Sequence, residues 1–332
     1  MRKKVFALMI PIIFLVSVAC GCSDKQGMSG TNKLDPLTVT ETASPEEKKK
    51  VSVGELIYTN LNSESSLDEV QSALKASGIE EEHVDKVVKW VRDYNACMKD
   101  CESFSLVGDF VTVDKKAIDY GEYYLMSKEW FKKNKRKYYD ILCRIAAFEL
   151  NRDNITVKNT ISKDEFNCWD DEKSWLYSDG DAILGRGADE GEYGEIPPFP
   201  MLDWNDQVKR EYFTLFDPVS IKENCSEEEM FRAIDKKWSE YGISFDEASY
   251  SLITFWLQVE NETAASHAAT LIETEYGLLL FEKTNPVEPY AATKFDNIEE
   301  VKGYLYEKMK LEYEKDGDIV PKYIILKNNK KI

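Results

Sequence analysis

Histidine is scarce in this chain, because its 332 residues include only His83 and His267. Structural zinc sites use four cysteine and histidine ligands, commonly arranged in paired Cys-x-x-Cys motifs. No paired motif of that spacing accompanies either histidine. The sequence therefore argues against a zinc site, and we expect neither a metal nor a cofactor.

Positive charge is also in short supply. Lysine and arginine number 43 against 61 aspartates and glutamates, which gives a formal net charge of -18. Proteins that bind nucleic acid or anionic headgroups by charge need clustered cations. The composition therefore excludes nucleic acid as a partner and fits a cationic ligand better.

The chain has no apolar run long enough to span a bilayer as a helix, which takes about 20 residues. Its longest run, residues 5–19, follows a cationic head at residues 2–4 and leads to small residues around Cys20 and Cys22. This arrangement is typical of a bacterial lipoprotein export signal over residues 1–22. We predict a protein that is exported, cleaved at a cysteine and held by lipid at the extracytoplasmic face of the cell membrane.

Two cysteines compete for the lipid. Ser17-Val18-Ala19, before Cys20, has a polar residue where an aliphatic one is usual, whereas the tripeptide before Cys22 contains a thiol. We predict attachment at Cys20, with Cys22 as the alternative.

The rest of the chain is expected to form a tether and one domain. Residues 23–53 are polar, lack an apolar period and predict a flexible tether. Residues 54–332 are long and apolar enough for a single domain, because the chain is 43% hydrophobic and 12% aromatic. Five cysteines remain in it, an odd number, so at least one thiol should be free.

Periodicity and capping signals predict an α+β fold, with a helical N-terminal layer packed on an antiparallel sheet from the C-terminal half and a papain-like topology. Capping boxes are predicted at Ser66–Glu69 and Ser226–Glu229, with Gly242 ending the second helix. The pattern over residues 128–150 predicts one continuous helix. The main predicted strands are residues 249–260, 266–274, 277–283 and 323–326. The last predicted helix is residues 298–311.

Three residues of the predicted domain have the side chains that cysteine-based acyl transfer requires: Cys143, His267 and Glu282. A hairpin turning near residue 275 would place His267 opposite Glu282 or Lys283. The order thiol, histidine, acceptor resembles the papain-like and transglutaminase-like superfamily. We predict Cys143 as nucleophile, His267 as general base and acid, and Glu282 as the group that orients the imidazole.

Charge distinguishes the candidate thiols, but each candidate residue could also have a purely structural role. Arg144 and the cationic residues 132–137 favour a thiolate at Cys143, whereas glutamates surround Cys225. Cys143 could equally be a core thiol inside a helix that begins earlier, and His267 a structural histidine. His83, in the first turn of its predicted helix, is expected at the surface.

Short segments in a fixed order resemble an uncharacterised family of Gram-positive lipoproteins, domain-of-unknown-function family 4300, from about Gly54 to the C-terminus. The segments that carry the resemblance are Tyr58-Thr59-Asn60-Leu61, Tyr94-Asn95, Tyr139-Asp140, Cys143-Arg144, Phe148 with Leu150, Ser266-His267-Ala268, Leu279-Leu280-Phe281-Glu282-Lys283, Pro289-Tyr290, Lys294-Phe295, Tyr304-Leu305 and Asn328-Asn329.

The resemblance implies a cluster of Cys143, Arg144, His267, Glu282 and Tyr290, in which Arg144 and Tyr290 would bind substrate. Arg144 would support the thiolate or dock a substrate carboxylate. The family pattern has an Asn before the Cys-Arg pair, a Gly after the His and a Gln after the Pro-Tyr pair. This chain has Leu142, Ala268 and Ala291 there, and an amide that helped to hold an oxyanion would be lost.

Two functions follow as hypotheses. The first is a cysteine-dependent hydrolase of the peptidase or amidase kind, or an acyl transferase, acting on peptide or cell-wall amides. The second is a non-catalytic surface lipoprotein that binds a protein partner or cationic ligand. Its binding site would be the acidic, aromatic loop around Trp169, Trp175 and Trp204.

Overall fold

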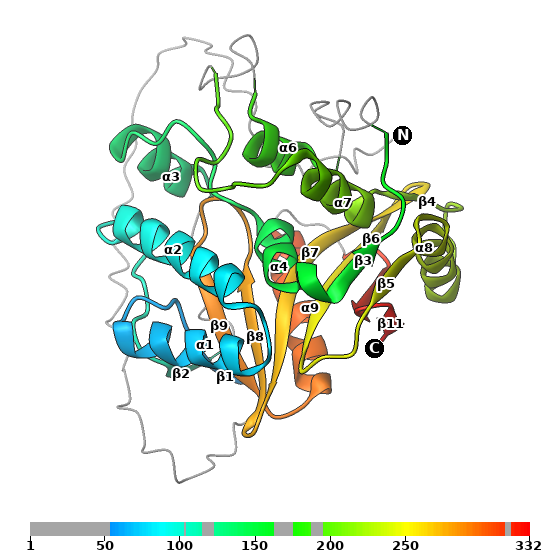
Figure 1. Ribbon diagram of the computed structural model, residues 1–332. Helices are drawn as coiled ribbons and strands as arrows, with labels where there is room; N and C mark the ends of the chain where they lie inside the picture. The colour runs from blue at the N-terminus through cyan, green and yellow to red at the C-terminus, as the bar shows by residue number, and fades with distance from the viewer. Residues whose placement is uncertain (1–53, 103, 115–122, 163–174, 187–194, 316–319) are drawn as a thin grey trace, which may run out of the picture.

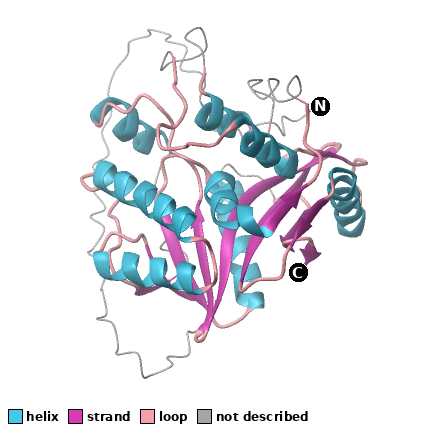
Figure 2. Cartoon of the chain, viewed as in Figure 1, coloured by secondary structure: helices cyan, strands magenta, loops and turns pink. Residues whose placement is uncertain are grey.

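The computed structural model describes residues 54–102, 104–114, 123–162, 175–186, 195–315 and 320–332. The predicted export signal, the tether, Cys168 and Trp169 lie outside these residues. The described part is a mixed α+β domain, which confirms the predicted fold class (Figures 1 and 2).

The centre of the domain is a large antiparallel sheet with the strand order β11-β10-β6-β7-β8-β9-β1-β2, in which β4 also pairs with β7. Most of these strands come from the C-terminal half, as predicted, but β1 and β2 come from the N-terminal part and extend the sheet beyond β9. The strands are β1 Glu55–Thr59, β2 Val111–Asp114, β4 Val219–Ser220, β6 Tyr250–Val259, β7 Glu262–Thr274, β8 Gly277–Lys283, β9 Tyr290–Phe295, β10 Tyr323–Lys327 and β11 Lys330–Lys331; β3 Ile155–Val157 pairs separately with β5 Ile243–Phe245.

Helices cover both faces of the sheet (Figure 1). One face carries α1 Glu64–Ala76, α2 Glu81–Met98, α4 Cys143–Asn151, α6 Tyr177–Leu184 and α7 Asp206–Phe216, together with the short α3 Tyr123–Lys128. The other face carries α9 Ile298–Lys315, whose Val301, Leu305 and Met309 form a second, smaller core cluster with sheet residues. Because both faces are covered, the central strands are buried along most of their length, as the buried residues of β6 show.

Helix α8, Glu227–Tyr241, begins and ends as predicted. The Ser226 hydroxyl accepts from the Glu229 backbone N–H and the Glu229 carboxylate accepts from the Ser226 N–H, while Gly242 adopts the left-handed conformation past the end, with φ 63°. The capping residue predicted for α1 is wrong by one turn. Ser63 is the cap, and its side chain accepts from the Ser66 N–H.

The predicted continuous helix over residues 128–150 is interrupted. Helix α3 passes into a π-helical turn at Glu129–Lys133, and Lys135 adopts a left-handed backbone with φ 56°. The indole of Trp130 donates to the Tyr138 carbonyl at 2.7 Å, which fixes the chain as it turns back. A new helix, α4, then begins at Cys143.

Candidate active site

Cys143 is the first residue of α4, the helix that packs against β7. The residue before it, Leu142, is extended with φ -101° and ψ 175°, and its side chain makes no capping hydrogen bond. The N–H groups of a first helical turn have no partner within the helix, and the helix dipole favours negative charge there. Cys143 therefore occupies the position on a helix that best stabilises a thiolate.

His267 lies on β7 next to an irregularity in the sheet. The β6–β7 register shifts between Phe255 and Trp256, and the hydroxyl of the extra residue, Ser266, donates to the Phe255 carbonyl at 3.0 Å. The β7–β8 ladder begins only at the Ala269–Glu282 pair. The predicted direct pairing of His267 with Glu282 or Lys283 is thus wrong, because His267 lies two residues beyond that pair and diagonal to Glu282.

The diagonal arrangement still brings the three predicted side chains into contact. The Nε2 atom of His267 lies 2.6 Å from Glu282 Oε2, and the imidazole also interacts with the Cys143 thiol, since each group shifts the pKa of the other. Diagonal neighbours across two strands are within reach of long side chains. The folded chain therefore places the thiol, the imidazole and the carboxylate in one line of interacting side chains.

The charges of this line are set by burial and by mutual contact. Burial raises the pKa of the Cys143 thiol, but the interaction with His267 and the charge of Arg144 outweigh it, so the pKa is lower than usual. Burial lowers the pKa of His267, whereas its bonds with Cys143 and Glu282 raise it, and the result is about 9. Both shifts favour a thiolate beside an imidazolium.

The Glu282 carboxylate has further partners on α9. Its Oε1 atom accepts from the Tyr304 hydroxyl and from the Lys308 ammonium at 3.1 Å. Burial raises the pKa of Glu282, while Lys308, His267 and Tyr304 together hold it well below its usual range. Glu282 is therefore a fixed anion that orients and stabilises a protonated His267.

The two residues that the family resemblance adds are both buried, and of the two Arg144 lies next to Cys143 and acts on its thiol. The Arg144 guanidinium binds the Asp179 carboxylate, with Nε to Oδ1 at 3.0 Å, and donates to the Ala265 carbonyl at 2.6 Å. It thus supplies charge to the neighbouring thiol rather than a group open to a substrate carboxylate. Tyr290 is fully buried, and its ring lies 4.3 Å from the Lys283 ammonium.

The candidate site is enclosed. The exposed fractions are 2% for Cys143, 3% for His267 and 1% for Glu282. The three side chains are therefore largely shielded from solvent.

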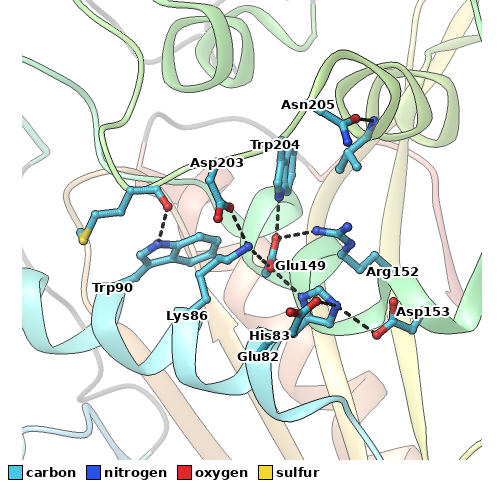
Figure 3. Close-up of polar contacts among 12 residues, drawn as sticks. Glu82, His83, Lys86, Trp90, Glu149, Arg152, Asp153, Asp203, Trp204 and Asn205 are labelled. Carbon is cyan, nitrogen blue, oxygen red and sulfur yellow. Dashed lines mark hydrogen bonds and ion pairs between the residues drawn. The ribbon is translucent and has the colours of Figure 1, made fainter.

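A second polar cluster was missed by sequence reasoning, and it is drawn in Figure 3. His83, expected at the surface, is only 2% exposed, and its Nδ1 lies 2.8 Å from a Glu149 oxygen. Glu149 also accepts from the Trp204 indole and pairs with Lys86 at 3.0 Å. A fully buried carboxylate needs such partners, so Glu149, a lone acid inside the apolar α4, was the signal that could have revealed this cluster.

A cavity of about 320 Å³ lies beside this cluster, lined by Glu82, Lys86, Lys89, Trp90, Pro200, Met201 and Asp203. Trp204, proposed from sequence as part of a binding loop, is instead 5% exposed and packs against the rings of Phe148 and Tyr212. It therefore belongs to the core.

No disulfide joins any two of the four cysteines in the described residues, which are Cys97, Cys101, Cys143 and Cys225. Within the same residues, no group of three or more histidine, cysteine or acidic side chains is placed to hold a metal ion. In the described part of the chain, no helix has both the length and the apolar character needed to cross a bilayer.

A protein family described as "Domain of unknown function (DUF4300)" matches residues 57–332. Comparison with curated proteins and with solved structures found no match. The papain-like topology therefore stays a prediction. The family match covers nearly the whole region for which the sequence predicted one domain, and the chain belongs to the DUF4300 family.

Proposed function

We propose that this chain is a lipid-anchored, extracytoplasmic cysteine hydrolase or acyl transferase that acts on peptide or cell-wall amides. The observation that carries the proposal is the Cys143–His267–Glu282 line, with the sulfur at the start of a helix. A nucleophile, a base within hydrogen-bond reach and a group that orients the base are the parts that a papain-like acyl transfer requires.

The chemistry assigns one task to each side chain. The Cys143 thiolate attacks the carbonyl carbon of the amide, and the carbon–nitrogen bond breaks as the His267 imidazolium protonates the leaving amine. A thioester remains on Cys143. Neutral His267 then takes a proton from water or from an acceptor amine, which attacks the thioester and releases the acid or the new amide. Glu282 keeps the imidazole oriented throughout.

The oxyanion formed in each step needs donors. The amide side chains of the family pattern are replaced by Leu142 and Ala291 in this chain. The uncapped first turn of α4 offers backbone N–H groups at the sulfur instead. These groups are the donors that we assign to the oxyanion.

The test is detection of an acyl-enzyme. The protein is incubated with peptide amides and with soluble cell-wall peptides, and the intact mass is followed together with amine release. The expected result is a covalent acyl adduct on the wild type that disappears in Cys143→Ala, whereas Cys225→Ala, which removes another buried thiol, retains it. Neither adduct nor amine release across these substrates would contradict the proposal.

One observation favours a second function. All three residues of the line are buried, as in a structural network. In that case the protein is a non-catalytic surface lipoprotein, and its net charge of -18 suits a cationic ligand or a basic partner. An unreactive Cys143, together with binding to a basic peptide that salt weakens, would favour this alternative.

The membrane anchor in both proposals rests on residues 1–22. The cationic head, the short apolar run and Cys20, with Cys22 as alternative, supply the signal. Metabolic labelling with a fatty acid tests it, because Cys20→Ser should abolish incorporation if Cys20 is the attachment site. Persistent labelling that is lost only in Cys22→Ser would move the site to Cys22.

A further inference from the structure

The two oxygens of the Glu282 carboxylate have different partners. Oε2 contacts His267 at 2.6 Å, while Oε1 accepts from the Tyr304 hydroxyl and from Lys308 at 3.1 Å. Tyr304 and Lys308 are four residues apart on α9, so both side chains lie on one face of that helix. Helix α9 thus holds the oxygen that His267 does not use.

Helix α9 and helix α4 lie on opposite faces of the sheet. Figure 1 shows α4, which begins at Cys143, on one face and α9 on the other. The Lys308 side chain is 18% exposed, whereas that of Glu282 is 1% exposed. A chain of interactions therefore runs from the partly exposed Lys308, through Glu282 and His267, to the thiol at the start of α4.

We propose that Tyr304 and Lys308 are positioning residues that keep Glu282 charged and aimed at His267, so that α9 sets the protonation state of Cys143 from the opposite face. This inference rests on the proposed function, because it concerns the same thiolate. It adds two residues and one helix to the acyl-transfer machinery.

The charged groups around Glu282 and the Cys143 thiol determine how a change at Lys308 affects the ionisation of Cys143. His267 of β7 and Tyr304 and Lys308 of α9 face Glu282. Of the single contributions that oppose the effect of burial on the Glu282 pKa, the charge of Lys308 is the largest, ahead of the hydrogen bond with His267. The groups that act on the thiol are His267, the adjacent Arg144 and, with the opposite sign, Asp179 of α6.

Removal of the Lys308 charge acts on the thiol through Glu282. Without the ammonium, the buried Glu282 carboxylate loses a charge that offsets its burial, and it takes up a proton more readily. A protonated Glu282 no longer supports the imidazolium that pairs with the thiolate. The thiolate then becomes less favourable, and the pH at which Cys143 ionises rises.

The experiment is a pH titration of the Cys143 thiolate by ultraviolet absorbance in the full chain, read as the difference from Cys143→Ala in the same background. In Lys308→Met we expect the midpoint to rise by about one pH unit, which means about tenfold less thiolate on the acid side. Lys308→Arg, which keeps the charge, should titrate like the wild type, and Tyr304→Phe should shift less than Lys308→Met. Circular dichroism checks that each variant is folded, and Lys308→Gln replaces Lys308→Met if the latter is not.

The outcomes separate this inference from the proposed function. A low midpoint in the wild type that Lys308→Met or Lys308→Gln leaves unchanged overturns the role of α9 and leaves the reactive thiol intact. A wild-type midpoint at the ordinary thiol value of 9.0 overturns the proposed function itself. A raised midpoint in Lys308→Arg equal to that in Lys308→Met would show that charge is not the cause, and would also overturn the inference.

Discussion

Replacement of Glu149 by glutamine should destabilise the protein in a way that depends on pH. Glu149 is fully buried on α4, and it accepts from the Trp204 indole and pairs with His83 and Lys86. Burial raises the pKa of this carboxyl, but these three partners lower it from 4.5 to about 2. A shift of this size corresponds to about 3 kcal/mol of stability at pH 7.

The sign of the pH dependence follows from the direction of the shift. A carboxyl whose pKa is lower in the folded state stabilises that state above its unfolded pKa, here 4.5, and this stabilisation is lost as the pH falls toward about 2. In Glu149→Gln, the amide also turns a donor toward groups that themselves donate. We therefore expect the variant to lose about 3 kcal/mol at pH 7, and about half of that at pH 3.

Urea unfolding at pH 7 and pH 3 measures both values. The matched control is Glu228→Gln, because Glu228 is an exposed acid on α8 that pairs with Arg232 at 3.1 Å, and its loss should change stability by less than about 0.5 kcal/mol. A Glu149→Gln effect as small as that of the control, or one equal at both pH values, would refute the reasoning.

Three further substitutions test the fold around the site by urea unfolding. Ser226→Ala removes the cap that accepts from the Glu229 N–H and should cost about 1 kcal/mol; an unchanged midpoint would contradict the cap. Arg144→Met leaves Asp179 buried without its cation and should cost about 3–5 kcal/mol, so a loss under about 1 kcal/mol would speak against the pair. Gly277→Ala places a Cβ 2.5 Å from the Phe295 carbonyl oxygen at φ 133° and should cost more than about 1 kcal/mol; a neutral result would argue against this turn.

Local signals in the sequence predicted local structure well. The Ser226 and Glu229 pair marked the start of α8, and the turn before Gly277 marked the β7–β8 hairpin, because both depend on neighbours within a few residues. The same reasoning failed at residues 128–150. There, the Trp130 indole contacts the carbonyl of Tyr138, eight positions further along the chain, and this turn leaves no trace in the hydrophobic periodicity.

The candidate site was predictable in its members but not in its detailed geometry. The types and order of Cys143, His267 and Glu282 were enough to name the three residues. The position of His267 depends on an extra residue at Ser266, and a bulge of this kind changes register without a sequence pattern to announce it. The partners of Glu282 on α9 lie 22 and 26 residues away, so only the fold reveals them.

The most direct test of the account is the protonation state of His267, measured by NMR of the histidine rings against pH. The chain has only two histidines, so Gln in place of His267 is enough to assign the signals. The account predicts that His267 is an imidazolium at pH 7.5 and loses its proton near pH 9, because Cys143 and Glu282 raise its pKa. A neutral His267 at pH 7 would contradict the thiolate–imidazolium pair on which the proposed chemistry depends.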